Sequence, residues 1–75
     1  MPKAFVMIDV HPGKETEVQS ALQRMDKVKF VYQVTGINDM VALVDAEPYE
    51  AFASLVSTIR RTDGVKDTDT MLVLK

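Results

Sequence analysis

Two segments with the same helical spacing of apolar residues most strongly constrain what this chain can fold into. In each segment the apolar residues recur at positions i, i+3, i+4 and i+7, which form one face of an α-helix. The first set is Val18, Ala21, Leu22 and Met25, and the second is Phe52, Leu55, Val56 and Ile59. The spacing predicts one helix over residues 14–25 and a second that begins at Pro48, each with one buried face.

The flanks of the second helix carry end signals of their own. Pro48 suits the first turn of a helix, and Asp45 or Glu47 is the expected N-cap. Arg60 and Arg61 fall in the last turn, where positive charge favours the helix dipole. Asp63-Gly64 is expected to end this helix.

Four further segments read as β-strands because they are rich in β-branched, aromatic and other apolar residues. They are residues 3–10, 28–35, 40–46 and 65–74. In the second strand, alternation predicts one face made of Val28, Phe30, Tyr32 and Val34. In the fourth strand, one face is expected to hold Val65, Met71 and Val73.

The resulting order, β-α-β-β-α-β, is that of the ferredoxin-like split βαβ arrangement. Right-handed crossovers place both helices on the same face of one four-stranded antiparallel sheet. The predicted fold class is therefore α+β, and residues 1–75 are expected to form a single domain.

The opposite face of that sheet has no helix to cover it. The first, third and fourth strands nevertheless carry apolar residues on both faces, as Phe5 and Met7 do against Val6 and Ile8. A monomer would expose these side chains as one large apolar patch, which soluble monomers rarely do. We expect a second copy to pack face to face about a two-fold axis, which gives a dimeric α/β barrel-like assembly. The alternative is that the outer residues are simply half-exposed.

Size and composition agree with that expectation and exclude several classes of function. A chain of 75 residues has a marginal core, and the absence of cysteine rules out disulfides, Fe–S clusters and cysteine–zinc sites. His11 is the only histidine, so neither a metal nor a cofactor is expected. The net charge of −2 disfavours direct binding to nucleic acid.

No apolar run reaches the roughly 20 residues of a membrane span. Met1-Pro2-Lys3 leads directly into the first strand without a signal peptide, which predicts a cytoplasmic protein.

The link between the second and third strands carries a more specific pattern, Val34-Thr35-Gly36-Ile37-Asn38-Asp39. This link resembles the Thr-Gly-x-x-Asp hairpin of the Lrp/AsnC (feast/famine) transcriptional regulators. It lies in their C-terminal ligand-binding domain, the regulation-of-amino-acid-metabolism (RAM) domain. The resemblance continues in Phe5-Val6-Met7-Ile8 with Pro12-Gly13-Lys14-Glu15, and in Gly64-Val65, Thr68-Asp69-Thr70 and Leu72-Val73-Leu74. It spans essentially all 75 residues.

The resemblance implies a regulatory module rather than an enzyme. Full-length members of the family carry an N-terminal helix-turn-helix DNA-binding domain, whereas here Met1 immediately precedes the first strand. We therefore expect a stand-alone ligand-binding domain. Family members assemble as dimers, commonly stacked into tetramers or octamers (a tetramer of dimers). The implied partners are further copies of this chain, full-length Lrp/AsnC-type regulators, and a small effector, chiefly an amino acid, bound at a subunit interface.

Carried over residue by residue, the effector site of the family implicates Thr35, Gly36, Asn38, Asp39, Thr68 and Thr70. An amino acid is a zwitterion, so Asp39 could pair with its ammonium group by a charge-assisted hydrogen bond. The N–H of Gly36 could face its carboxylate, because no Cβ blocks the approach. The alternative is structural. Gly36 would then supply only a positive φ for the turn, and Asp39 would only accept hydrogen bonds from backbone N–H groups.

Two other functions use the same fold. Small dimeric α+β barrel monooxygenases and isomerases work in a cleft between helices and sheet, where the candidates would be His11, Tyr32 and Asp9. An RNA-binding sheet needs aromatic residues on its central strands, and residues 40–46 contain none. We therefore predict a non-enzymatic module for effector binding and oligomerisation.

Overall fold

The computed structural model describes residues 3–75, so the expected lead-in of Met1 and Pro2 lies outside the described residues. The elements are β1 (Lys3–Val10), α1 (Glu15–Gln23), β2 (Val28–Gln33), β3 (Met40–Asp45), α2 (Tyr49–Arg61) and β4 (Val65–Leu72). This order confirms the predicted β-α-β-β-α-β arrangement. The strands form one sheet in the order β2-β3-β1-β4, and every neighbouring pair is antiparallel.

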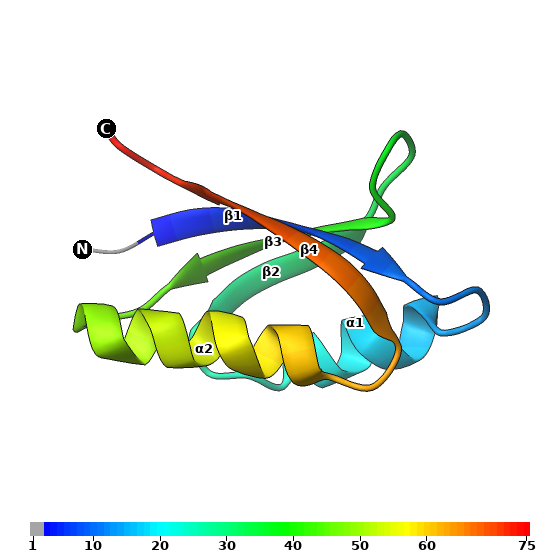
Figure 1. The fold of residues 1–75 in the computed structure, drawn as a ribbon, viewed down its shortest axis with the longest axis horizontal. Helices are drawn as coiled ribbons and strands as arrows, with labels where there is room; N and C mark the ends of the chain where they lie inside the picture. The colour runs from blue at the N-terminus through cyan, green and yellow to red at the C-terminus, as the bar shows by residue number, and fades with distance from the viewer. Residues whose placement is uncertain (1–2) are drawn as a thin grey trace.

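Both helices lie on one face of the sheet, as predicted (Figure 1). Strict alternation along β1 turns Ala4, Val6, Ile8 and Val10 toward the helices, where all four are buried. Alternate residues of β3 join them from the neighbouring strand. The helices contribute the apolar stripes read from the sequence, and their buried members are Val18, Leu22, Phe52 and Ile59. The core is therefore one layer between the sheet and the helices.

A bulge in β2 changes the faces that alternation predicted. The register with β3 shifts between Val28 and Phe30, so that Val28 lies opposite Val44 and Val31 lies opposite Ala42. One extra residue in a strand moves everything beyond it to the other face. Val28 and Val31 are consequently both buried against the helices, while Phe30 lies on the outer face. The prediction that Val28 shares a face with Phe30 and Tyr32 is wrong for this reason.

A second irregularity has the same effect in β4. The register between β1 and β4 shifts between Asp9 and Val10, and Val65 pairs with the buried Val10. Met71 pairs with Phe5, which belongs to the outer face. Val65 packs against the core and Met71 does not, so the prediction that the two share a face is wrong.

The helix ends differ from the expected caps. The N-cap of α2 is Pro48, and within the described chain no side chain caps this helix. Asp45, one of the two expected caps, ends β3 instead, where its N–H donates to the carbonyl of Lys27 (3.0 Å). The alternative cap, Glu47, does not take that role either. The basic pair Arg60 and Arg61 does occupy the last turn of α2, as predicted.

Gly64, just before β4, packs closely against α1 and the residue that precedes it. Its φ is +97°, and a Cβ built at this position would lie 2.8 Å from Cγ2 of Val18 and 3.0 Å from Cβ of Lys14. Real Cβ atoms essentially never come as close as the first of these distances. The glycine therefore lets the connection after α2 pass directly against the first helix.

The outer face of the sheet is uncovered by any element within residues 3–75. Among its apolar side chains, Phe5 is 39% exposed, Met71 48% and Tyr32 57%. The rings of Phe30 and Tyr32 stack with centroids 5.0 Å apart. An apolar face with no cover in one chain is the feature on which the expected sheet-on-sheet dimer depends.

None of the helices within residues 3–75 has the length and apolar character that crossing a membrane requires.

Candidate ligand-binding site

The β2–β3 loop, residues 34–39, stands at one end of the sheet and rises on the side away from the helices (Figure 1). The N–H of Val34 donates to the carbonyl of Asp39 (2.9 Å), which closes the loop as a hairpin. Gly36 has a φ of +112°, a region that residues with a Cβ rarely adopt. Ile37 is 97% exposed at the tip. The loop therefore presents backbone and small polar groups to solvent.

Asp39 ties this loop to the end of β1. Its Oδ2 accepts a hydrogen bond from the N–H of Val10 (2.9 Å), and its own N–H donates to the carbonyl of Ile8 (3.0 Å). The N–H of Val10 lies at the register shift of β1, where the regular ladder with β4 is interrupted. Asp39 is half-buried and satisfies a backbone donor, which is the structural role considered as the alternative for this residue. One carboxylate oxygen remains for other contacts.

Asn38 and Asp9 extend the same polar cluster. Nδ2 of Asn38 donates to Oδ1 of Asp9 at 3.1 Å. Asp9 in turn lies opposite Asp67 of β4. The structure thus adds Asp9 to the expected site, whereas the sequence analysis names it only among the candidates for an enzyme. The sequence does mark this residue, because Asp9 is the one charged residue in the otherwise apolar stretch from Ala4 to Val10.

Thr68 and Thr70 do not join the loop within one chain. They pair with Ile8 and Val6, whose side chains are buried beneath the helices, so both threonines turn toward the helix face of the sheet. Thr70 lines a cavity of about 350 Å³ between β4 and α2. Of the six predicted residues, the structure brings together the four of the loop and places the two threonines on the opposite face.

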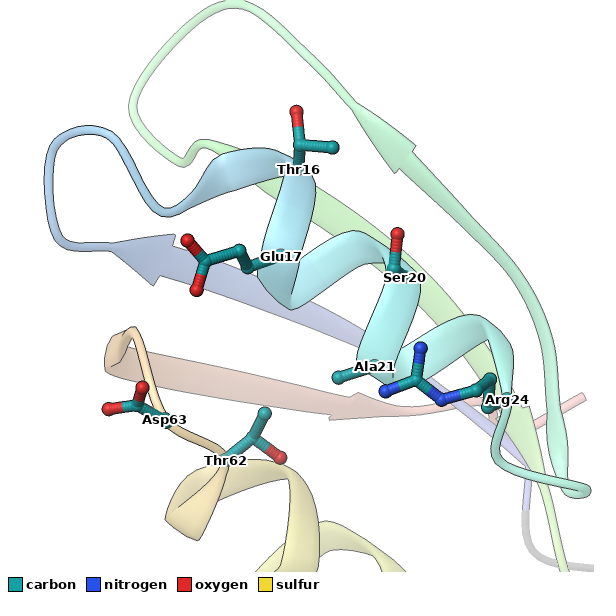
Figure 2. A pocket seen from close by; sticks show the side chains of 7 residues that line it. All are labelled: Thr16, Glu17, Ser20, Ala21, Arg24, Thr62 and Asp63. Atoms are coloured by element: carbon teal, nitrogen blue, oxygen red, sulfur yellow. The ribbon is translucent and has the colours of Figure 1, made fainter.

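A second hollow lies on the helix side, between α1 and the end of α2 (Figure 2). Its volume is about 530 Å³, and its lining residues are Thr16, Glu17, Ser20, Ala21, Arg24, Thr62 and Asp63. Arg24 comes from the end of α1, and Asp63 from the link after α2 (Figure 2). None of the predicted site residues lines this hollow. Within residues 3–75, no three His, Cys, Asp or Glu side chains are grouped so as to hold a metal ion.

Comparison with known proteins identifies the family. The family model described as the Lrp/AsnC ligand binding domain matches residues 3–75. The chain belongs to the Lrp/AsnC ligand-binding domain family. The HTH-type transcriptional regulator FL11 of Pyrococcus abyssi is 39% identical to it over 72 residues, which cover 96% of this chain and 48% of the regulator. The chain spans about half the length of the curated relatives that it matches.

Solved structures show the same fold over nearly the full chain. TTHA0845 from Thermus thermophilus superposes with a TM-score of 0.92 at 33% identity, covering 100% of this chain and 95% of that one. FFRP-DM1 superposes with a TM-score of 0.94 at 29% identity, covering 99% and 100% of the two chains. The superpositions confirm the predicted α+β fold, and the family match confirms the predicted resemblance. They also make the chain a regulatory ligand-binding domain rather than an enzyme.

Proposed function

We propose that this chain binds an amino acid or a related small metabolite at a subunit interface. In this role it is a non-enzymatic effector-binding and oligomerisation module that takes part in regulating amino-acid metabolism or transcription in the cytoplasm. The match of residues 3–75 to the Lrp/AsnC ligand-binding domain carries the proposal. Two structural features support it, namely the polar loop at the end of the sheet and the uncovered apolar face beside it.

The polar loop offers complementary chemistry for a zwitterion. Asp39 and Asp9 each use one carboxylate oxygen within the chain, to Val10 and Asn38, which leaves a second oxygen on each for the ammonium group. The exposed hydroxyl of Thr35 and the N–H of Gly36 lie in the same loop and can donate to the carboxylate. Thr68 and Thr70 face the other side of the sheet, so in this proposal they contact an effector held by another subunit.

The uncovered face offers a surface for a second copy of the chain. Phe5, Tyr32 and Met71 are partly exposed there, and stacking two such faces about a two-fold axis removes them all from water at once. Tyr32→Glu is expected to weaken this contact without unfolding the chain, because the side chain is already 57% exposed. Light scattering of the two proteins at equal micromolar concentration tests this, and an unchanged mass would contradict face-to-face packing.

A thermal-shift screen against the twenty amino acids, each at millimolar concentration, tests the effector. A ligand present at about 100 times its dissociation constant stabilises the native state by about 2.7 kcal/mol. In a domain of this size that corresponds to a rise in Tm of roughly 10–20 °C. We expect a selective rise with one or a few amino acids. No rise with any of them would contradict an amino-acid effector.

Variants of the loop then locate the site. Thr35→Ala removes an exposed hydroxyl and is expected to lower the affinity for that amino acid without changing Tm in its absence. Ile37→Ser is the matched control, because it changes the most exposed side chain of the same loop and no proposed ligand contact. Equal affinities for both variants and the parent protein would remove Thr35 from the site.

A further inference from the structure

The hollow between α1 and the end of α2 contains charged side chains that have no partner of opposite charge. Arg24 and Asp63 both line it (Figure 2). Neither side chain forms a hydrogen bond or an ion pair within residues 3–75. Glu17, the third charged residue of the lining, pairs with Lys14 at 3.7 Å, and this pair is exposed to solvent. One cation and two carboxylates of the hollow are therefore accessible to a ligand.

The opposite charges stand at opposite ends of this hollow. Figure 2 shows the carboxylates of Glu17 and Asp63 at one end and the guanidinium of Arg24 at the other. Ala21 and Thr62 lie between the two ends. Glu17 and Arg24 are seven residues apart, so their Cα atoms are separated by about 10.5 Å along the helix axis. The side chain of Arg24 turns back toward Ala21, which shortens the gap between the charged groups (Figure 2).

The lining also offers three hydroxyl groups. Thr62 is half-buried, and its Oγ1 donates to the carbonyl of Thr58 (2.9 Å), which leaves the oxygen free to accept a hydrogen bond. Thr16 and Ser20 line the hollow from α1, and their hydroxyls have no hydrogen-bond partner in the described part of the chain. Polar groups of a ligand that lie between its charges therefore find both donors and acceptors here.

The wall formed by the link after α2 is held in place by backbone hydrogen bonds. The carbonyl of Thr62 accepts a hydrogen bond from the N–H of Val65 (3.1 Å), and the carbonyl of Gly64 accepts one from the N–H of His11 (2.9 Å). Asp63 lies between these two bonded residues, so its backbone is fixed beside α1 before any ligand binds. A preformed wall lowers the ordering cost of binding.

We propose that this hollow binds a small zwitterion whose opposite charges are several bonds apart, as they are at the two termini of a dipeptide. Two extended residues span at most about 7 Å. The carboxylate of such a ligand pairs with Arg24, and its ammonium group pairs with Glu17 and Asp63. A peptide N–H between them donates to Oγ1 of Thr62. The hollow of about 530 Å³ also falls within the range of about 300–1,000 Å³ that is typical of small-molecule sites.

This site is distinct from the effector site of the proposed function. The α-ammonium and carboxylate groups of an amino acid are separated by one carbon atom, so these two groups cannot reach both ends of the hollow. The β2–β3 loop instead places the carboxylate of Asp39 beside the donors Thr35 and Gly36, which suits a compact zwitterion. The hollow lies on the helix side of the sheet, so packing of two outer faces leaves it open (Figure 2). Either site can therefore be tested without the other.

Titration with glycylglycine, followed by ¹H–¹⁵N NMR of the full chain, tests the site. We expect the backbone amides of residues 16–24 and 62–64 to shift, while those of residues 35–39 stay unchanged. The dissociation constant should be on the order of 1 mM, because exposed charge contacts are individually weak. The absence of shifts at concentrations well above that value would overturn the proposal, as would shifts confined to residues 35–39.

Analogues of the dipeptide test the requirement for two separated charges. N-Acetylglycylglycine lacks the ammonium group and glycylglycine amide lacks the carboxylate, so each should bind about threefold to fivefold more weakly, within the range measured for exposed charge pairs. Equal affinity for the acetylated peptide would overturn the zwitterion assignment. 5-Aminopentanoate separates its charges by the same number of bonds without a peptide group. Affinity equal to that of glycylglycine would identify an ω-amino acid as a sufficient ligand, whereas weaker binding would identify a peptide.

Two variants assign the ends of the hollow. Arg24→Gln removes the cation at an exposed position and should raise the dissociation constant of glycylglycine about threefold to fivefold. Arg61→Gln is the matched control, because it makes the same change at an exposed residue that does not line the hollow. Asp63→Asn should weaken binding of glycylglycine but not of its acetylated form, a difference that a merely structural role would not produce. Equal dissociation constants for R24Q and R61Q would overturn the proposed site.

Discussion

Replacing Gly64 by alanine tests how closely the link between α2 and β4 packs against α1. A Cβ at this position would lie 2.8 Å from Cγ2 of the buried Val18, and the φ of +97° is itself unfavourable for a residue with a Cβ. The backbone strain costs about 1–2 kcal/mol, partly offset by about 0.4–1 kcal/mol from the less flexible unfolded chain. Overpacking of a core contact adds about 1–3 kcal/mol. We expect Gly64→Ala to lower the free energy of unfolding by about 2–4 kcal/mol.

Gly36 supplies the matched control for this prediction. Its φ of +112° is similar, but a Cβ there would meet nothing within 4 Å, so Gly36→Ala carries the strain without the clash. We expect a loss of only about 0.5–1 kcal/mol. Urea unfolding at one fixed protein concentration measures both, because assembly makes stability depend on concentration. Equal losses for the two variants would refute the argument that Gly64 is required by the contact with Val18.

Three further substitutions test the packing and the hydrogen bonding separately. For each, urea unfolding at the same fixed protein concentration measures the change in the free energy of unfolding. Asp39→Ala should cost about 1–3 kcal/mol by leaving the N–H of Val10 without its partner, and a loss below about 0.5 kcal/mol would show that water replaces it. Leu22→Ala should cost about 2–5 kcal/mol because the side chain is fully buried, whereas the exposed neighbour Gln23→Ala should stay within about 0.5 kcal/mol. Glu17→Gln should cost less than about 1 kcal/mol, since its 3.7 Å ion pair with Lys14 is solvent-exposed, and a larger loss would contradict that view.

The fold was predictable because its signals are local. The stripe around Val18 and Leu22 has helical period, the alternation of Val6 and Ile8 has strand period, and glycine marks the turn at residue 36. The faces of β2 and β4 were not predictable, because a bulge leaves no compositional mark near Phe30 or Val10. The extra residue becomes visible only when the partner strand sets the register.

The candidate site in the β2–β3 loop was likewise predictable only in part. The pattern of Thr35, Gly36 and Asp39 was recognisable in the sequence, and the structure gathers these residues in one loop. The contribution of Asp9 depends on β1 ending beside that loop, 29 residues away in the sequence from Asn38, whose side chain donates to it. No local pattern encodes a contact of such long range.

The sequence by itself determined the order of elements, the helix faces and an outer sheet face that is apolar without a cover. These follow from hydrophobic periodicity, which each segment carries alone. Only the tertiary structure decided which sheet edge stays open. Gln19 reaches the carbonyl of Val31 because α1 lies beside β2, whereas no side chain within residues 3–75 forms a hydrogen bond with the backbone of Thr70 or Leu72 in β4. Whether side chains bond the backbone of a sheet edge depends on which elements lie beside it, and this is fixed only when the chain folds.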